Sequence, residues 1–188
     1  MKVNDAIKKR RSLRLLKKTD VSQEKIHELI QAAKLAPSCF NNQPWRYVFV
    51  NDQDQLDNLK DAYSDGNEWA YKSSLTIAVF SHKDLDCKVT NRRYYLFDTG
   101  ISVGFILLKA TELGLVTHPI AGFSQKKVKK ILNIPDQMKV ITLIIVGKKV
   151  DSLPADIDKK TQKSELNRPP RLQNKEFVFM NKVENARE

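Results

Sequence analysis

Apolar residues recur at helical spacing in some segments of this chain and gather in short runs in others. Apolar positions three and four residues apart indicate amphipathic helices, whereas short runs bounded by turn residues indicate strands. The pattern predicts helices over residues 4–11, 23–36, 56–63, 92–113 and 125–132, and strands over residues 45–50, 75–80 and 140–147. Past Gly147 the chain is polar through Lys163 without strong periodicity, which predicts an extended arm.

Two polar side chains mark the starts of the first two helices. Asn4 and Ser22 each precede or open a helical pattern, and such side chains accept hydrogen bonds from the first turn. Both are therefore predicted to be caps. The second helix is predicted to bury one apolar face, formed by Ile26, Leu29, Ile30 and Ala33.

The segment 92–113 is the longest helical pattern and is apolar nearly all round. A helix of this kind is buried on all sides, which in a chain of this size suggests that a second subunit covers part of it. Gly100 and Gly104 would allow another helix to come close. A core helix in a monomer remains the alternative. The predicted inner face consists of Tyr94, Phe97, Ile101, Phe105 and Leu108.

Length and composition indicate one domain or slightly more, with a substantial core. The chain has 188 residues, of which 41% are hydrophobic. Its two cysteines, Cys39 and Cys87, have no spacing that suggests a metal site or a disulfide framework. No apolar run approaches the roughly 20 residues that span a bilayer, and no secretory signal is evident. We expect a cytoplasmic protein with no metal and no membrane partner.

The net charge of +11 admits two interpretations. A basic chain can be a non-enzymatic module that binds nucleic acid or another anionic partner. Here, however, the lysines are scattered in short helical groups, and no aromatic residues interleave with them as on a single-strand stacking surface. We interpret most of the charge as solvated surface, part of which attracts an anionic cofactor, and expect no nucleic-acid partner.

The loop between the second helix and the first strand is unusual. It runs from Pro37 to Pro44, and prolines at both ends restrict its backbone. Its amide side chains donate and accept hydrogen bonds without charge, which suits the edge of a flat, polar ring system. An ordinary helix-to-strand turn would use similar residues. The candidate ligand-binding residues are Pro37, Ser38, Cys39, Asn41 and Gln43.

A second candidate site lies near the N-terminus. Three guanidinium groups and a hydroxyl fall within the five residues Arg10, Arg11, Ser12, Leu13 and Arg14. In an extended segment, alternation places Ser12 and Arg14 on one side. Converging cations would repel unless an anion lies between them, and phosphate fits that role. A solvated basic surface is the alternative.

Together the two stretches, about 25 residues apart, resemble the nitroreductase family of FMN-dependent oxidoreductases. That family has an Arg-x-Ser-x-Arg/Lys phosphate motif followed by Ala-Pro-Ser-x-x-Asn-x-Gln-Pro-Trp, and residues 36–45 fill every fixed place of the second. The resemblance implies an α+β fold with a central mixed, mostly antiparallel sheet flanked by helices. It also implies an intertwined homodimer of single-domain chains (residues 1–188), in which residues 148–188 extend onto the partner subunit.

The same resemblance implies further FMN-binding residues along the chain. Asn67 stands in a segment that supplies a polar contact to the flavin, and Ile120, Ala121 and Gly122 lie along the ring. Many relatives carry an acidic residue where Ala121 stands. Late in the chain, either or both of Arg168 and Arg171 would return to the phosphate, because a double proline between them departs from the usual pattern.

The activity implied by the resemblance is reduction of nitroaromatics, quinones or related small electrophiles by NADH or NADPH. The flavin carries the chemistry, so no catalytic acid, base or nucleophile is expected from the protein. His118 has no carboxylate placed to orient it and is interpreted as structural. Cys39 is a candidate reactive thiol beside the flavin, although a packing role is favoured.

Overall fold

The computed structural model describes residues 1–183 and divides into two compact units, Met1–Pro154 and a second unit that begins at Ala155. No helix in the described range is both long enough and apolar enough to cross a membrane. The first unit contains the sheet and both predicted motifs. The second contains a short helix, α6 (Lys159–Leu166), capped by Asp158, whose carboxylate accepts from the Thr161 N–H at 2.9 Å. This helix lies partly where the sequence predicted an extended arm.

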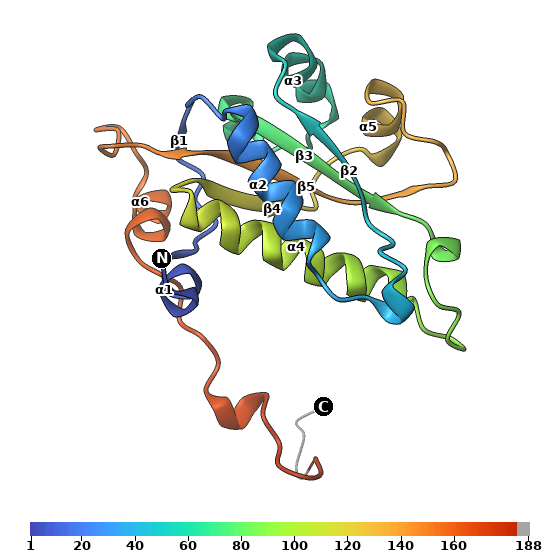
Figure 1. Ribbon diagram of the computed structural model, residues 1–188. Coiled ribbons are helices and arrows are strands. Elements are labelled where there is room, and N and C mark those ends of the chain that lie inside the picture. Colours follow the sequence, from blue (N-terminus) through green and yellow to red (C-terminus); the bar gives the residue numbers. More distant parts are fainter. Residues whose placement is uncertain (184–188) are drawn as a thin grey trace. The chain divides into compact units, whose positions relative to one another are not determined.

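A five-stranded sheet forms the centre of the first unit (Figure 1). Its strands pair in the order β1-β5-β3-β2, with β4 also paired to β5, and every ladder in the described chain is antiparallel. The predicted strands 45–50, 75–80 and 140–147 are confirmed. The strands are β1 (Leu16–Lys17), β2 (Arg46–Val50), β3 (Leu75–Ser81), β4 (Val116–Ile120) and β5 (Lys139–Lys149).

Strand β5 divides the core into two layers because its side chains alternate between the faces of the sheet. Leu143 and Ile145 pack on one face with residues of α3 (Gln53–Leu59) and α5 (Gln125–Ile131). On the other face, Ile144 and Val146 pack with residues of α2 (Gln23–Lys34) and α4 (Tyr94–Glu112). All four β5 side chains are fully buried, each contributing about 1.5–3 kcal/mol. The sheet therefore lies between two helical layers (Figure 1).

The predicted helix caps are correct at α2 but wrong at α1 (Val3–Lys9). Ser22 Oγ accepts from the Lys25 N–H at 3.5 Å, as expected of a cap. Asn4 instead lies inside α1, whose cap position is Lys2 without a side-chain hydrogen bond. One member of the predicted α2 face also differs, because Ile30 is exposed whereas Ile26, Leu29 and Ala33 are buried.

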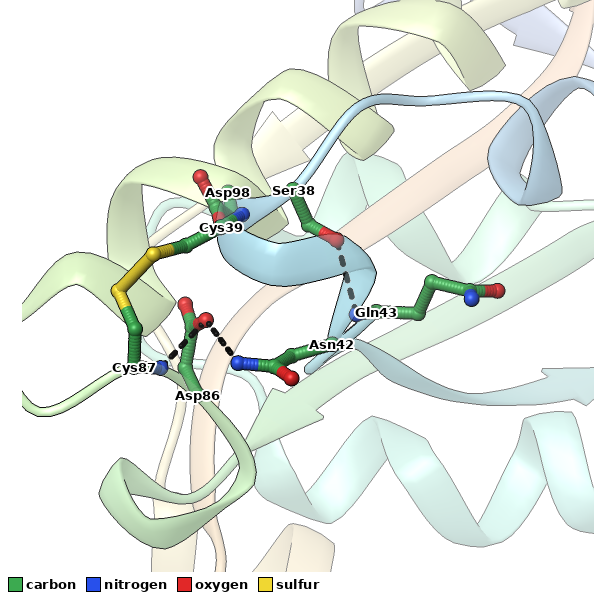
Figure 2. The surroundings of a disulfide bond; sticks show 7 residues. All are labelled: Ser38, Cys39, Asn42, Gln43, Asp86, Cys87 and Asp98. Carbon is green, nitrogen blue, oxygen red and sulfur yellow. Dashed lines mark hydrogen bonds between the residues drawn. A yellow bond between two sulfur atoms is a disulfide. The ribbon is translucent and has the colours of Figure 1, made fainter.

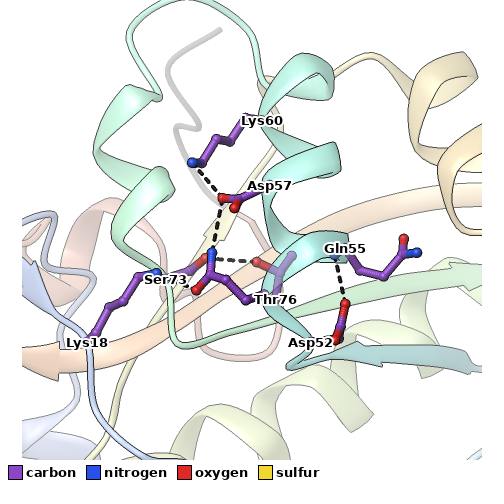
Figure 3. A network of polar contacts seen from close by, with 8 residues as sticks. Lys18, Asp52, Gln55, Asp57, Lys60, Ser73 and Thr76 are labelled. Atoms are coloured by element: carbon purple, nitrogen blue, oxygen red, sulfur yellow. Dashed lines mark hydrogen bonds and ion pairs between the residues drawn. The ribbon is translucent and has the colours of Figure 1, made fainter.

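A polar network fixes helix α3 at the edge of its layer. Asp52 caps the helix by accepting from the Gln55 N–H at 3.0 Å, and Asp57 pairs with Lys60 at 2.6 Å (Figure 3). Each of these surface contacts contributes little, about 0–1 kcal/mol. Further along the chain, a 3-10 helix at Glu68–Lys72 contributes to the candidate site.

The buried face of α4 differs from the predicted one. The residues that it buries within its own chain are Tyr95, Asp98, Thr99, Ser102, Ile106 and Ala110. Of the predicted inner face, Phe97 is 58% exposed and Phe105 39% exposed. A β-carbon added at Gly100 or Gly104 would meet no heavy atom within 4 Å, so both glycines border open space. Part of the apolar surface of α4, including Phe97 and Phe105, thus points away from the core of its own subunit.

The half-buried Tyr47 connects β2 to these helices and makes the free energy of unfolding depend on pH in the alkaline range. The Tyr47 hydroxyl lies 2.6 Å from Ser102 Oγ, which itself donates to the Ala33 carbonyl at 3.0 Å. Burial raises the pKa of Tyr47 to about 12, against a smaller opposite effect of the Ser102 bond. An unfolded tyrosine ionises near pH 10, so this group's contribution is full below pH 10 and is lost as pH rises towards 12.

We therefore expect wild-type protein to lose about 2–3 kcal/mol more stability than Tyr47→Phe between pH 9 and pH 12. Urea unfolding at both pH values measures the difference. Tyr71→Phe, which alters a 40%-exposed tyrosine, is the matched control and should keep the wild-type pH dependence. Equal losses in wild type and Tyr47→Phe would contradict the prediction.

Candidate functional site

The loop after α2 has a strained backbone that its own side chains close. Phe40, Asn41 and Gln43 all have left-handed φ angles, of 48°, 57° and 49°. Such angles cost non-glycine residues about 1–3 kcal/mol each unless the surroundings hold them. Ser38 Oγ accepts from the Gln43 N–H at 2.9 Å, and Gln43 Nε2 donates to the Asn41 carbonyl at 3.1 Å. The rigidity predicted from the prolines is therefore reinforced by hydrogen bonds across the loop.

The same loop is anchored to two segments that are distant in sequence (Figure 2). The Cys39 N–H donates to Asp98 Oδ2 of α4 at 2.7 Å, and Asn42 Nδ2 donates to Asp86 Oδ1 at 3.4 Å. Cys39 is also joined to Cys87 by a disulfide. The spacing of the two cysteines does not indicate this disulfide, and while it is formed Cys39 is not the reactive thiol considered from the sequence. A contact between residues 48 positions apart leaves no local trace in the sequence.

Asp98 is a buried carboxyl beneath this anchor. It is 1% exposed, and burial raises its pKa, with the nearby Asp86 acting in the same direction. The N–H of Cys39 opposes the shift by stabilising the ionised form. The carboxyl thus serves as a fixed acceptor for the loop backbone in a site where a second negative charge is already close.

The N-terminal basic segment lies at the other end of the unit and is extended as predicted. Ser12 and Arg14 are exposed while Leu13 between them is buried, which confirms the expected alternation. Arg10 Nη1 donates to Ser12 Oγ at 3.2 Å. The Arg14 guanidinium lies over the Trp69 ring, 5.9 Å from its centroid. These donors gather on one surface, and Arg11 beside them is half-buried.

The basic segment contacts Trp69 through Arg14 and His118 through the Leu13 carbonyl. Their rings lie 4.6 Å apart, and His118 Nδ1 hydrogen-bonds to the Leu13 carbonyl at 3.2 Å. His118 therefore has the structural role expected of it. Trp69 is not among the predicted site residues, because 55 positions separate it from Arg14 and nothing local links the two. Its indole ring is nevertheless a common partner for guanidinium stacking.

The segment 120–122 ends strand β4 and adjoins the Glu68–Lys72 turn. The Gly122 carbonyl accepts from the Ser64 N–H at 3.1 Å and from Asn67 Nδ2 at 3.0 Å. A side-chain carbon on Gly122 would lie 2.5 Å from Asn67 Nδ2, so a larger residue there would displace the Asn67 side chain. Ile120 is buried, whereas Ala121 is exposed. Asn67 thus positions the 120–122 backbone, and a direct flavin contact from it stays a prediction.

One chain does not bring the two predicted motifs together. The loop 38–43 binds Asp98 near the start of α4, whereas the N-terminal amine pairs with Glu112 at the end of α4, at 3.5 Å. Fourteen residues of helix separate these anchors by about 21 Å. Arg168 and Arg171 belong to the second unit, so their role stays a prediction as well.

Comparison with known proteins gives the family. The model of the nitroreductase family matches residues 7–81 and 66–148. A nitroreductase family protein of Clostridium novyi, solved as a crystal structure, is 30% identical, with a TM-score of 0.75 over 80% of this chain and 87% of that one. An FMN-dependent nitroreductase of Clostridium difficile is 25% identical, with a TM-score of 0.72 over 95% and 98% of the two chains.

A protein of similar sequence is also named as a nitroreductase. The oxygen-insensitive NADPH nitroreductase of Helicobacter pylori is 27% identical over 183 residues, covering 78% of this chain and 85% of that protein. The family match spans both sequence motifs, the sheet and helix α4. The α+β fold implied by the sequence is therefore confirmed, and the chain belongs to the nitroreductase family of oxidoreductases.

Proposed function

We propose that this protein is an FMN-dependent oxidoreductase that uses NADH or NADPH to reduce nitroaromatics, quinones or related small electrophiles. The observation that carries the proposal is the loop 38–43, which bears the family's complete amide motif and is already held in an unusual backbone shape. The solved relative from Clostridium difficile is described as FMN-dependent, and the relative from Helicobacter pylori as an NADPH nitroreductase.

The N-terminal segment fits the phosphate of FMN. Arg10, Ser12 and Arg14 provide donors on one surface, and guanidinium groups bind phosphate oxygens in pairs. Stacking of Arg14 on Trp69 restricts its side chain before an anion arrives, which lowers the entropy lost on binding. Arg168 or Arg171, or both, would add to this site.

The loop 38–43 and the segment 120–122 fit the flavin ring of FMN. The loop 38–43 offers backbone and amide groups in a fixed arrangement, and Asn67 holds the backbone of the segment 120–122 in place through the Gly122 carbonyl. When bound, FMN supplies the hydride chemistry, receiving from the nicotinamide and passing to the acceptor in turn. The protein's own groups bind and orient, and donors near the ring would stabilise negative charge on it.

A homodimer would complete the site. Because the two motifs lie at opposite ends of α4, the loop of one subunit would meet the basic segment of its partner across a two-fold axis. The exposed apolar face of α4, with Phe97 and Phe105, provides a surface for that pairing. In this arrangement residues 148–188 would reach the partner subunit.

The test uses the full chain incubated with FMN and then freed of unbound ligand. We expect one FMN per chain, seen as visible flavin absorbance, in a dimer by light scattering. Anaerobic NADH or NADPH should bleach the flavin, and a nitroaromatic or a quinone should restore its colour. A colourless protein after incubation, or a flavin that neither nucleotide reduces, would refute the proposed function.

A further inference from the structure

The cysteine pair joins the loop 38–43 to the segment before α4 and can exist in two redox states. Cys39 begins the turn Cys39–Asn41, and Cys87 follows the short turn Lys83–Leu85. These are the only cysteines in the sequence. A dithiol or phosphine reductant would supply two electrons and, with two protons, break the S–S bond to give two thiols. Reduction therefore leaves two sulfur ligands facing each other at one place.

Asp86 stands beside the two sulfurs with one oxygen unused. It is 7% exposed, and its Oδ1 accepts from the Cys87 N–H at 2.8 Å and from Asn42 Nδ2 at 3.4 Å. Its Oδ2 is buried and has no hydrogen-bond partner among the described residues. Figure 2 shows this second oxygen on the side of the disulfide. A buried carboxylate oxygen without a partner is costly unless a cation or donor satisfies it.

The geometry of the three side chains fits a metal ion. The two sulfurs and an oxygen of Asp86 all lie within 4.8 Å of one another. Tetrahedral zinc has Zn–S bonds of about 2.3 Å, which places two sulfurs about 3.8 Å apart. Starting from a disulfide of about 2.05 Å, the sulfurs would need to separate by less than about 2 Å. Two hydrogen bonds already fix the Asp86 carboxylate, as the ligands of metal sites require.

Access and charge also favour a metal ion. Cys87 lines an open cavity of about 590 Å³, together with the basic residues Lys83, Lys88, Arg92 and Arg93. Cations near a thiol favour the thiolate, which is the form that binds metal. Two thiolates, one carboxylate and a divalent cation carry a net charge of −1, to which the nearby Asp98 adds when ionised, and the basic lining offsets this charge. Thiolate ligands select zinc and similar soft cations over magnesium or calcium.

We propose that Cys39, Cys87 and Asp86 form a redox-controlled site for a thiol-binding divalent cation, with Zn²⁺ as the expected ion. The oxidised protein carries the disulfide and binds no metal there, whereas the reduced protein binds one ion per chain. The disulfide in the oxidised protein and the metal ion in the reduced protein would each link the loop 38–43 to the segment before α4. The loop would thus stay anchored in both oxidising and reducing conditions.

The test measures metal binding by the full chain, independently of flavin. Protein is reduced with a phosphine, freed of reductant without air, and titrated with Cd²⁺ while the ultraviolet thiolate-to-cadmium band is followed. Zn²⁺ is then measured by competition with a colorimetric chelator. We expect one ion per reduced chain, none in the oxidised protein, and two titratable thiols that appear only on reduction.

Substitutions separate this site from non-specific binding. Replacing both cysteines in the double variant Cys39→Ser/Cys87→Ser should abolish the thiolate band, and Asp86→Asn should weaken Zn²⁺ binding by more than the roughly 10–100-fold that loss of an outer partner costs. Asp84→Asn, which alters an exposed carboxylate at the same cavity, is the matched control and should bind as wild type. The proposal fails if the reduced wild type binds no more tightly than the double serine variant, or if Asp84→Asn and Asp86→Asn lose affinity equally.

Discussion

Replacing Arg14 with alanine is expected to weaken FMN binding about 10–150-fold, which corresponds to about 1.5–3 kcal/mol. Arg14 is exposed and stacks on Trp69, which restricts the orientation in which its guanidinium would meet a phosphate. Loss of a charge-assisted hydrogen bond lowers the binding free energy by an amount of this size. Fluorescence titration of the variant with FMN, compared with wild type at the same ionic strength, measures the change.

Two further variants show whether geometry or charge is responsible. Arg14→Lys keeps the charge but lacks the planar pair of donors, so it should recover only part of the lost affinity. Lys126→Ala removes an exposed charge from α5 and should leave FMN affinity unchanged. Wild-type affinity in Arg14→Ala would remove this residue from the phosphate site, while a loss in Lys126→Ala as large as in Arg14→Ala would indicate a general charge effect instead.

Strong local patterns account for the parts of the fold that could be predicted from the sequence. Strand β3 is apolar except for Thr76 and Ser81, and the amide motif of the loop 38–43 fills a fixed pattern. Strand β4 carries Pro119 and β1 has only two residues, so neither has a recognisable period. Helix α6 has a good cap in Asp158, but its surface is almost wholly polar, so no apolar periodicity predicts it.

Helix α4 shows why hydrophobicity alone indicates the wrong face. The side of α4 that packs on its own core includes Asp98, Thr99 and Ser102, each satisfied by a hydrogen bond. Thr99 donates to the Tyr95 carbonyl at 2.7 Å, and Ser102 donates to the Ala33 carbonyl at 3.0 Å. Burial of such residues depends on partners that a sequence pattern does not reveal. The predicted apolar face is real, but it lies outside the subunit core.

Replacing Phe97 with glutamate is expected to convert the proposed dimer into monomers and to release FMN. Phe97 is 58% exposed in the single chain, so the substitution leaves the subunit core intact. In a two-fold interface through α4 it would bury two carboxylates without partners, at a cost of about 3–5 kcal/mol each. Size-exclusion chromatography with light scattering measures the mass, and flavin absorbance of the eluted peak measures the retained cofactor.

The control at the same position is Phe97→Leu, which keeps an apolar side chain and should remain a yellow dimer. Circular dichroism of Phe97→Glu should match wild type, because the helix packs on its core through its opposite face. If Phe97→Glu stayed dimeric, the subunits would associate through another surface. If it became monomeric yet retained FMN, one chain would suffice for the site, and the separation of the two motifs along α4 would have no functional meaning.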